Sequence, residues 1–210
     1  MRLEGKTAIV IGAGQSPGQR IGNGRATALR FTQEGAKVMA VDRDLRSAAE
    51  TASMAKQSDG ECIAFEADVT KEATLAAAIS AAHERWGHID ILHYNVGVSI
   101  GGGDAPLLEF TEEAFDRISA INLRGAIMAC KHVIPIMRQQ RAGAITMISS
   151  LAALAELSQL EGQRNRKANK NNVHNQKVST TFGWSPLVHH MPISADSGWR
   201  LRRQGEVELF

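Results

Sequence analysis

The sequence has 210 residues, 43% of them apolar, which is enough for one domain with a sizeable core. It has no run of about eighteen apolar residues and no secretory-type start, which argues against a membrane-spanning chain. We therefore expect a soluble, cytoplasmic protein. Cys62 and Cys130 have no neighbouring cysteine in the sequence, so we expect free, buried thiols rather than a disulfide or a metal site.

The net charge of +2 is unevenly distributed. Residues 1–161 hold 16 Lys and Arg against 19 Asp and Glu, whereas residues 162–210 hold 8 against 3. Composition changes at the same place, because residues 162–179 are rich in Asn, Gln, Lys and Arg and show neither helical nor strand periodicity. We expect a folded domain over residues 1–155 and an atypical, poorly ordered basic tail over residues 156–210.

Before that change, segments typical of strands and helices alternate along the chain. Strands are expected at residues 7–12, 36–42, 61–69, 88–97 and 142–150. Helices are expected at residues 22–34, from Asp44 to near Gly60, from Thr70 to Trp86, and at residues 111–138. Gly35 and Gly87 are natural helix ends, Asp44 and Thr111 are natural N-caps, and Pro135 marks a kink or a final turn.

Five strands separated by helices predict an α/β fold with right-handed crossovers. The expected architecture is a Rossmann-type doubly wound parallel sheet, C-terminally incomplete because the pattern stops near residue 156. In such a sheet, ligands bind at the carboxyl ends of the strands.

A glycine-rich loop lies between the first expected strand and the first expected helix. A dinucleotide fold needs glycines there for a tight turn, for close approach of the backbone to the pyrophosphate, and for helix packing. The loop is longer than the compact form, and a purely structural turn would have the same composition. The candidate cofactor contacts are Gly12, Gly22 and Gly24, with Gly14 and Gly18 shaping the turn and Ile21 beside Gly22.

Asp42 stands at the end of the second expected strand, about thirty residues after the first glycine. A carboxylate there can accept both ribose hydroxyls and repel a 2′-phosphate, which favours NAD over NADP. Arg20 and Arg43 could instead attract a phosphate, and Asp42 could be a simple helix-capping acid. Asp68 and Val69 end the third strand, where an adenine ring would lie, although Asp68 could equally be a cap.

Further motifs follow the same order: Trp86 to Leu92, Asn95-Val96-Gly97, Asn122-Leu123-Arg124-Gly125 and Ile148-Ser149-Ser150. Together with the glycine loop and Asp42, they make residues 3–155 resemble the short-chain dehydrogenase/reductase family. The resemblance implies hydride transfer between NAD(H) and an alcohol or ketone. It also implies that Asn95, Val96 and Gly97 line the cofactor cleft, with Val96 in place of the family's alanine.

The family's catalytic set implies Asn122, one of Ser149 and Ser150, and a tyrosine followed four residues later by a lysine. Tyrosine serves as acid and base for the substrate oxygen, and lysine lowers the phenol's pKa. The pair is expected near residues 162–167, where Lys167 follows Gln163 by four residues. A glutamine amide cannot exchange a proton at neutral pH, and no tyrosine follows Tyr94, which we expect to be a packing residue. Activity of this chain is therefore doubtful.

Two other classes of function stay open. The chain could be a non-catalytic dinucleotide-binding protein, or its basic tail, with Trp184 and Trp199, could bind nucleic acid. The tail could also be a solvated segment or the product of a reading-frame change, which is the favoured interpretation. The histidines show no metal-ligand spacing, so no metal is expected. The expected partners are a small alcohol or ketone and further copies of the chain, with no membrane.

Overall fold

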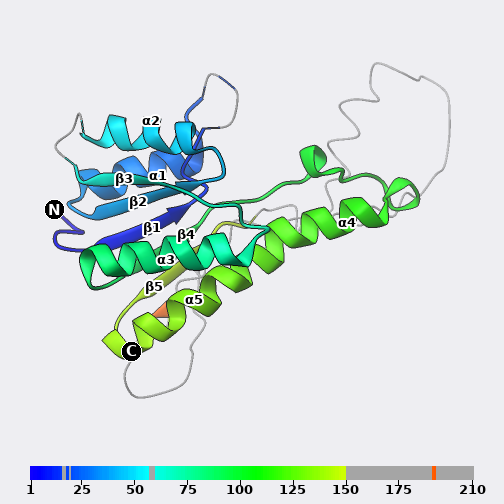
Figure 1. Cartoon of the computed structure of the whole chain (residues 1–210). Helices are drawn as coiled ribbons and strands as arrows, with labels where there is room; N and C mark the ends of the chain where they lie inside the picture. The colour runs from blue at the N-terminus through cyan, green and yellow to red at the C-terminus, as the bar shows by residue number, and fades with distance from the viewer. Residues whose placement is uncertain (16–17, 19, 57–59, 150–190, 193–210) are drawn as a thin grey trace, which may run out of the picture.

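A computed structural model describes residues 1–15, 18, 20–56, 60–149 and 191–192 of the chain. Five parallel strands form a sheet in the order β3-β2-β1-β4-β5 (Figure 1). This confirms the predicted doubly wound arrangement. The strands are β1 (Thr7–Ile11), β2 (Lys37–Asp42), β3 (Cys62–Glu66), β4 (Ile91–Tyr94) and β5 (Ala144–Met147). A two-residue strand from the expected tail, β6 (Met191–Pro192), pairs antiparallel with β5.

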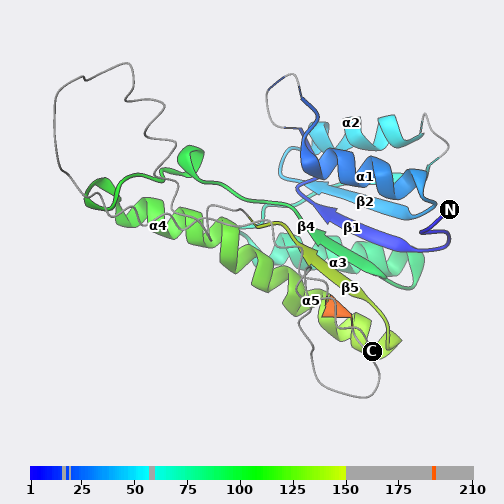
Figure 2. The same ribbon diagram turned by 180° about the vertical axis from the view of Figure 1, so that it is seen from behind.

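Helices cover both faces of the sheet. Figures 1 and 2 show α1 and α2 on one face and α3 and α5 on the other. The helices are α1 (Asn23–Gln33), α2 (Leu45–Lys56), α3 (Glu72–Trp86), α4 (Glu112–Ser119) and α5 (Gly125–Gln140). Short 3-10 turns, η1 (Ile100–Gly102) and η2 (Leu107–Glu109), lie between β4 and α4.

The core divides into two apolar clusters because side chains alternate across each strand. In β1, Ile9 and Ile11 pack toward α3 and α5, whereas Ala8 and Val10 pack toward α1 and α2. All five residues of β1 are buried, as expected of a central parallel strand.

Most of the predicted helix ends are confirmed. Thr111 Oγ1 accepts a hydrogen bond from Ala114 N at 3.2 Å, Asp44 caps α2, and Gly87 ends α3 in the left-handed conformation. The predicted start of the third helix at Thr70 is wrong. The Asp68 carboxylate accepts both the backbone N–H and the hydroxyl of Thr70, at 3.0 and 2.7 Å, so the chain first turns and α3 begins at Glu72.

The long helix predicted over residues 111–138 contains a π turn, η3 (Ala120–Arg124), between α4 and α5. Four of the buried residues around this turn, Ala114, Ile118, Asn122 and Ala126, follow one another at steps of four. In a regular α-helix each such step drifts by about 40° around the axis, because a turn takes 3.6 residues. The wider π turn, closed by a bond from Gly125 N to Ala120 O, keeps these residues on one face.

Among the described residues, no helix combines the length and apolar character needed to cross a membrane, and no cluster of potential metal ligands occurs. Cys62 is buried and Cys130 is half-buried, and both are free thiols. Burial raises the pKa of each thiol to about 11, so both stay protonated near neutral pH.

Candidate functional site

The carboxyl ends of β1, β2 and β4 bring three predicted site segments together. Ile11 lies in register with Val41 on one side and with Tyr94 on the other. Gly12 N then donates to Val41 O at 2.8 Å, and Asn95 N donates to Ile11 O at 2.9 Å. The glycine loop, the end of β2 and the Asn95 turn therefore share one edge of the sheet.

Two glycines allow α1 to approach the end of β1. A Cβ atom on Gly24 would lie 1.8 Å from the carbonyl oxygen of Gly12, so only glycine fits at position 24. Gly12 has a φ of +84°, and a Cβ there would lie 2.8 Å from Val96 Cγ2. Gly22 is the N-cap of α1. This is the close helix-to-strand packing that the glycine pattern predicted.

Asp42 joins the glycine loop to the residue that caps α2. Its Oδ2 accepts a hydrogen bond from Gly14 N at 2.8 Å, and its Oδ1 accepts one from Asp44 N at 3.1 Å. A Cβ atom on Gly14 would lie 2.6 Å from Asp42 Oδ2, so the glycine makes room for the carboxylate. The helix cap is Asp44, whose Oδ1 accepts from Arg46 N. The alternative that Asp42 caps the helix is therefore unnecessary.

The outer part of the loop is bridged by one side chain. Gln15 Oε1 accepts a hydrogen bond from Gly22 N at 2.8 Å, and Gln15 Nε2 donates to Arg20 O at 2.8 Å. Gly18 and Ile21, two further predicted contacts, are exposed on this loop. This amide oxygen, bound at the N–H of the N-cap Gly22, occupies the kind of position where a helix N-terminus attracts an anion.

Asn95 and Asn122 hold the segment that leaves β4. Asn95 Nδ2 donates to Gly12 O at 3.2 Å. Asn122 is buried in η3, where its Oδ1 accepts from Val98 N and its Nδ2 donates to Val98 O, both at 2.8 Å. Gly97 lies beside it, since a Cβ there would be 3.8 Å from Asn122 Oδ1. The amide of Asn122 therefore fixes the backbone after the Asn95-Val96-Gly97 turn.

Asp68 and Val69 follow β3 at the same edge. Burial acts to raise the pKa of the Asp68 carboxyl, but hydrogen bonds from Thr70 and the positive charges of Lys71 and Arg43 outweigh it and lower the pKa. Val69 is buried in the cluster under α3 and α5. Asp68 therefore makes the local turn described above and is not the N-cap of α3, which is Lys71.

Tyr94 and Ser149 differ in exposure. Tyr94 is fully buried, its hydroxyl donates to Ile121 O inside the π turn at 2.6 Å, and burial raises its pKa above the ordinary value. It is a packing residue, as expected. Ser149 is half-buried and lies two residues beyond the end of β5. The residue between them, Ile148, donates its N–H to Tyr94 O at 2.9 Å. Ser150 lies outside the described residues.

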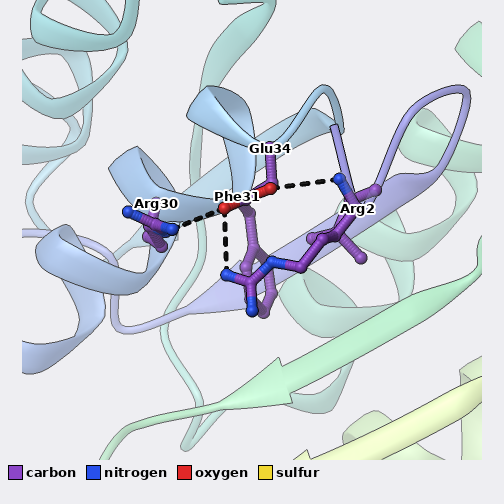
Figure 3. Close-up of a pocket in the computed structure, with 5 residues that line it drawn as sticks. Arg2, Arg30, Phe31 and Glu34 are labelled. Carbon is purple, nitrogen blue, oxygen red and sulfur yellow. Dashed lines mark hydrogen bonds and ion pairs between the residues drawn. The ribbon is translucent and has the colours of Figure 1, made fainter.

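A cavity of about 340 Å³ lies away from this edge, beside the end of α1 and the chain's first residues. Figure 3 shows the Glu34 carboxylate between Arg2 and Arg30, with Phe31 beside it. The hydrogen bonds from Arg2 lower the pKa of Glu34 to about 2. These contacts attach the N-terminus to α1, and none of the predicted site residues lines the cavity. We therefore assign it a structural role.

Sequence reasoning missed Arg25, which is buried although it is charged. It stands directly after Gly24 on α1 and bonds to residues of α2. Its position beside the glycine motif was the one available signal, because its partners lie more than twenty residues further along the chain.

Comparisons with known proteins point to one protein family. The family model for short chain dehydrogenases matches residues 6–161. Over 150 residues the chain is 38% identical to 2-(R)-hydroxypropyl-CoM dehydrogenase of Xanthobacter autotrophicus, covering 70% of this chain and 57% of that protein. It is 34% identical to levodione reductase of Leifsonia aquatica, covering 71% and 54%.

A solved structure of 7α-hydroxysteroid dehydrogenase, in complex with NADH and 7-oxo glycochenodeoxycholic acid, superimposes with a TM-score of 0.66 at 31% identity. The match covers 73% of this chain and 56% of that one. The chain thus spans less than two thirds of the length of each of these three proteins.

Proposed function

Because the chain belongs to the short-chain dehydrogenase family, we propose that its domain binds NAD(H) at the carboxyl edge of the sheet. We further propose descent from oxidoreductases that transfer hydride between a nicotinamide and an alcohol or ketone. The observation that carries the proposal is the Asp42 carboxylate, held against Gly14 N of the glycine loop at 2.8 Å.

The residues present fit such a cofactor. Gly12 and Gly24 let α1 start close against the end of β1, which places a helix N-terminus at this edge, and the N–H of Gly22, the N-cap, already binds an oxygen atom of Gln15. The proposed contacts are Gly12, Gly14, Gly18, Ile21, Gly22 and Gly24 for the phosphates, Asp42 for the ribose, Asp68 and Val69 for the adenine, and Asn95, Val96 and Gly97 for the cleft wall.

When bound, the nicotinamide supplies or accepts the hydride. Of the chain's own residues, Ser149 and Ser150 are proposed to orient the substrate oxygen by hydrogen bonds. Asn122 holds the backbone of Val98, and through it the wall of the cleft. None of these three side chains can supply a proton at neutral pH. We therefore propose that this chain binds NAD(H) but turns it over slowly.

Replacing Asp42 tests the cofactor preference. In Asp42→Asn, the amide oxygen can still accept from Gly14 N, but the acceptor for Asp44 N and the negative charge that repels a 2′-phosphate are lost. We expect the preference of the parent for NADH over NADPH to shrink by at least about tenfold. The ribose hydroxyls of NADH lose a hydrogen bond to a charged group, worth about 1.5–3 kcal/mol, and the 2′-phosphate of NADPH is no longer repelled. Titration calorimetry with both cofactors measures the change.

The matched control is Asp44→Asn, which removes an acid two residues away that caps α2. It should leave the ratio of the two affinities unchanged. Tighter binding of NADPH than NADH by the parent chain would overturn the assignment of Asp42.

A non-catalytic dinucleotide-binding protein is the second candidate, favoured by the complete burial of the chain's single tyrosine. NAD titration and turnover assays separate the two candidates, and nucleic-acid titration tests the basic tail. We also propose that the chain forms homo-oligomers and lies in the cytoplasm. The proposed domain boundary near residue 155 falls outside the described residues, which leave out 150–190 and 193–210.

A further inference from the structure

We propose that Arg25 is a positioning residue for the glycine loop. It holds Ser47 and Thr51 of α2, and these two side chains hold the backbone of Ala13 and Gln15. The inference rests on the proposed function, since the segment that Arg25 positions is the one assigned to the cofactor's pyrophosphate.

The guanidinium of Arg25 is enclosed between α1 and α2. Its side chain is 10% exposed. Nε donates to Thr51 Oγ1 at 2.9 Å, and Nη2 donates to Ser47 O at 3.0 Å and lies 3.3 Å from Ser47 Oγ. Nη2 also pairs with Glu50 Oε2 at 3.0 Å. A buried guanidinium is tolerated only when its N–H groups are paired, and here every partner lies on one face of α2.

The same two hydroxyl groups reach the loop. Thr51 is fully buried, and its Oγ1 donates to Ala13 O at 2.8 Å. Ser47 Oγ accepts from Gln15 N at 2.6 Å. A hydroxyl has one proton and two lone pairs, so a donor on the Thr51 oxygen leaves its proton for a carbonyl. Of the two carbonyl oxygens in reach of that proton, Ala13 O at 2.8 Å is nearer than Ser47 O of the same helix at 3.2 Å, so Arg25 leaves the Thr51 hydroxyl to hold the loop.

Three consecutive loop residues are thus each held by a different side chain. Thr51 holds Ala13 O, Asp42 holds Gly14 N and Ser47 holds Gln15 N. The loop is longer than the compact glycine motif, and a longer loop loses more conformational entropy when it is ordered. Fixing its first residues before the ligand arrives reduces that cost at the moment of binding.

The geometry requires arginine rather than a positive charge alone. Nε contacts Thr51 while Nη2 contacts Ser47 and Glu50, so two separate nitrogen atoms of a planar group are used. A lysine has one ammonium group at the end of a flexible stem and cannot make both contacts with the same geometry.

The test compares Arg25→Gln and Arg25→Lys with the parent by hydrogen exchange without ligand and by calorimetry with NADH. We expect the amides of Gly14 and Gln15 to exchange about tenfold faster in both variants, while amides of β1 and β4 keep their parent rates. NADH should bind about tenfold more weakly, the effect of losing one hydrogen bond to a charged group. The matched control is Arg30→Gln on the same helix, where the side chain pairs with Glu34. It should behave like the parent.

Ser47→Ala and Thr51→Val each remove one of the two hydroxyl groups that join Arg25 to the loop. Both variants should reproduce the faster hydrogen exchange of the loop amides. Ser47→Ala combined with Arg25→Gln should have less than the summed effect, because both changes break one network. The proposal would be overturned if the amides of Gly14 and Gln15 exchanged at parent rates in Arg25→Gln, or if the amides of β1 and β4 exchanged faster by the same factor. If Arg25→Gln does not fold, Arg25→Lys and Ser47→Ala decide the question. If the parent does not bind NADH, the proposed function fails, while ligand-free exchange still decides the role of Arg25.

Discussion

The 210-residue chain should reduce ketones with NADH about a hundred- to ten-thousandfold more slowly than a version carrying a Tyr-x-x-x-Lys segment from the family in place of residues 156–210. Reduction of a ketone leaves a developing alkoxide that needs a proton, and general acid catalysis is typically worth a factor of this size. The measurement is the absorbance of the reduced cofactor with a panel of ketones and secondary alcohols.

The structure supports this expectation through Tyr94. It is the chain's single tyrosine, it is fully buried, and its hydroxyl is bonded to Ile121 O. Burial disfavours the phenolate, so Tyr94 is unsuited to acid and base catalysis. The amide of Asn122 is also committed, to both backbone groups of Val98.

Calorimetry with NADH on both proteins is the control, because a difference in cofactor binding would otherwise imitate a difference in catalysis. One result would contradict the expectation. If the parent turns over at rates normal for the family, and Ser149→Ala with Ser150→Ala abolishes that turnover, the chain contains a proton donor that we have not identified.

In His93→Leu, the free energy of unfolding should fall much less between pH 7 and pH 4 than it does in the parent. His93 is buried on β4, with Nδ1 2.7 Å from Thr146 Oγ1 and Nε2 without a partner among the described residues. Burial lowers the pKa of this imidazole from 6.5 to about 4. As the pH falls below 6.5, the unfolded chain therefore takes up a proton that the folded protein does not, and unfolding becomes more favourable until about pH 4.

The parent should lose on the order of 3 kcal/mol of unfolding free energy through His93 between pH 7 and pH 4, since one pKa unit corresponds to about 1.36 kcal/mol. Urea denaturation at several pH values measures the loss, which should be absent from His93→Leu. His88→Leu, at a side chain that is 44% exposed, is the matched control and should keep the parent's acid sensitivity. Equal acid sensitivity of the parent and His93→Leu would disprove the assignment.

The sheet could be predicted from the sequence because its signals are local. The apolar run of β1 and the glycines that follow it lie within a few residues of one another, and so do Asp44 and the start of α2. Asp42 was assigned to the cofactor edge from its place after a strand, and the structure puts it beside Gly14. Its role with a cofactor stays a prediction.

What could not be predicted depends on contacts between distant parts of the chain. The hydrogen bonds of Arg25 form only because α1 and α2 lie side by side, and the sequence alone does not indicate which helices are neighbours. The late start of α3 depends on Asp68 binding Thr70 instead of leaving Thr70 free to cap. The steps of four from Ala114 to Ala126 were a visible sign of the π turn, but the sequence alone does not show that these positions are buried.

The π turn also lets this region change in length. It holds a residue more than an α-helix would need between α4 and α5. Deleting a single residue within Ala120–Arg124 would restore regular α-helix, and α4 would keep its rotation relative to α5 because the π turn only accommodates that extra residue. Ile118 would then stay on the buried face. An alignment gap at this position in a relative therefore indicates a chain that lacks the π turn and in which α4 packs on the same side.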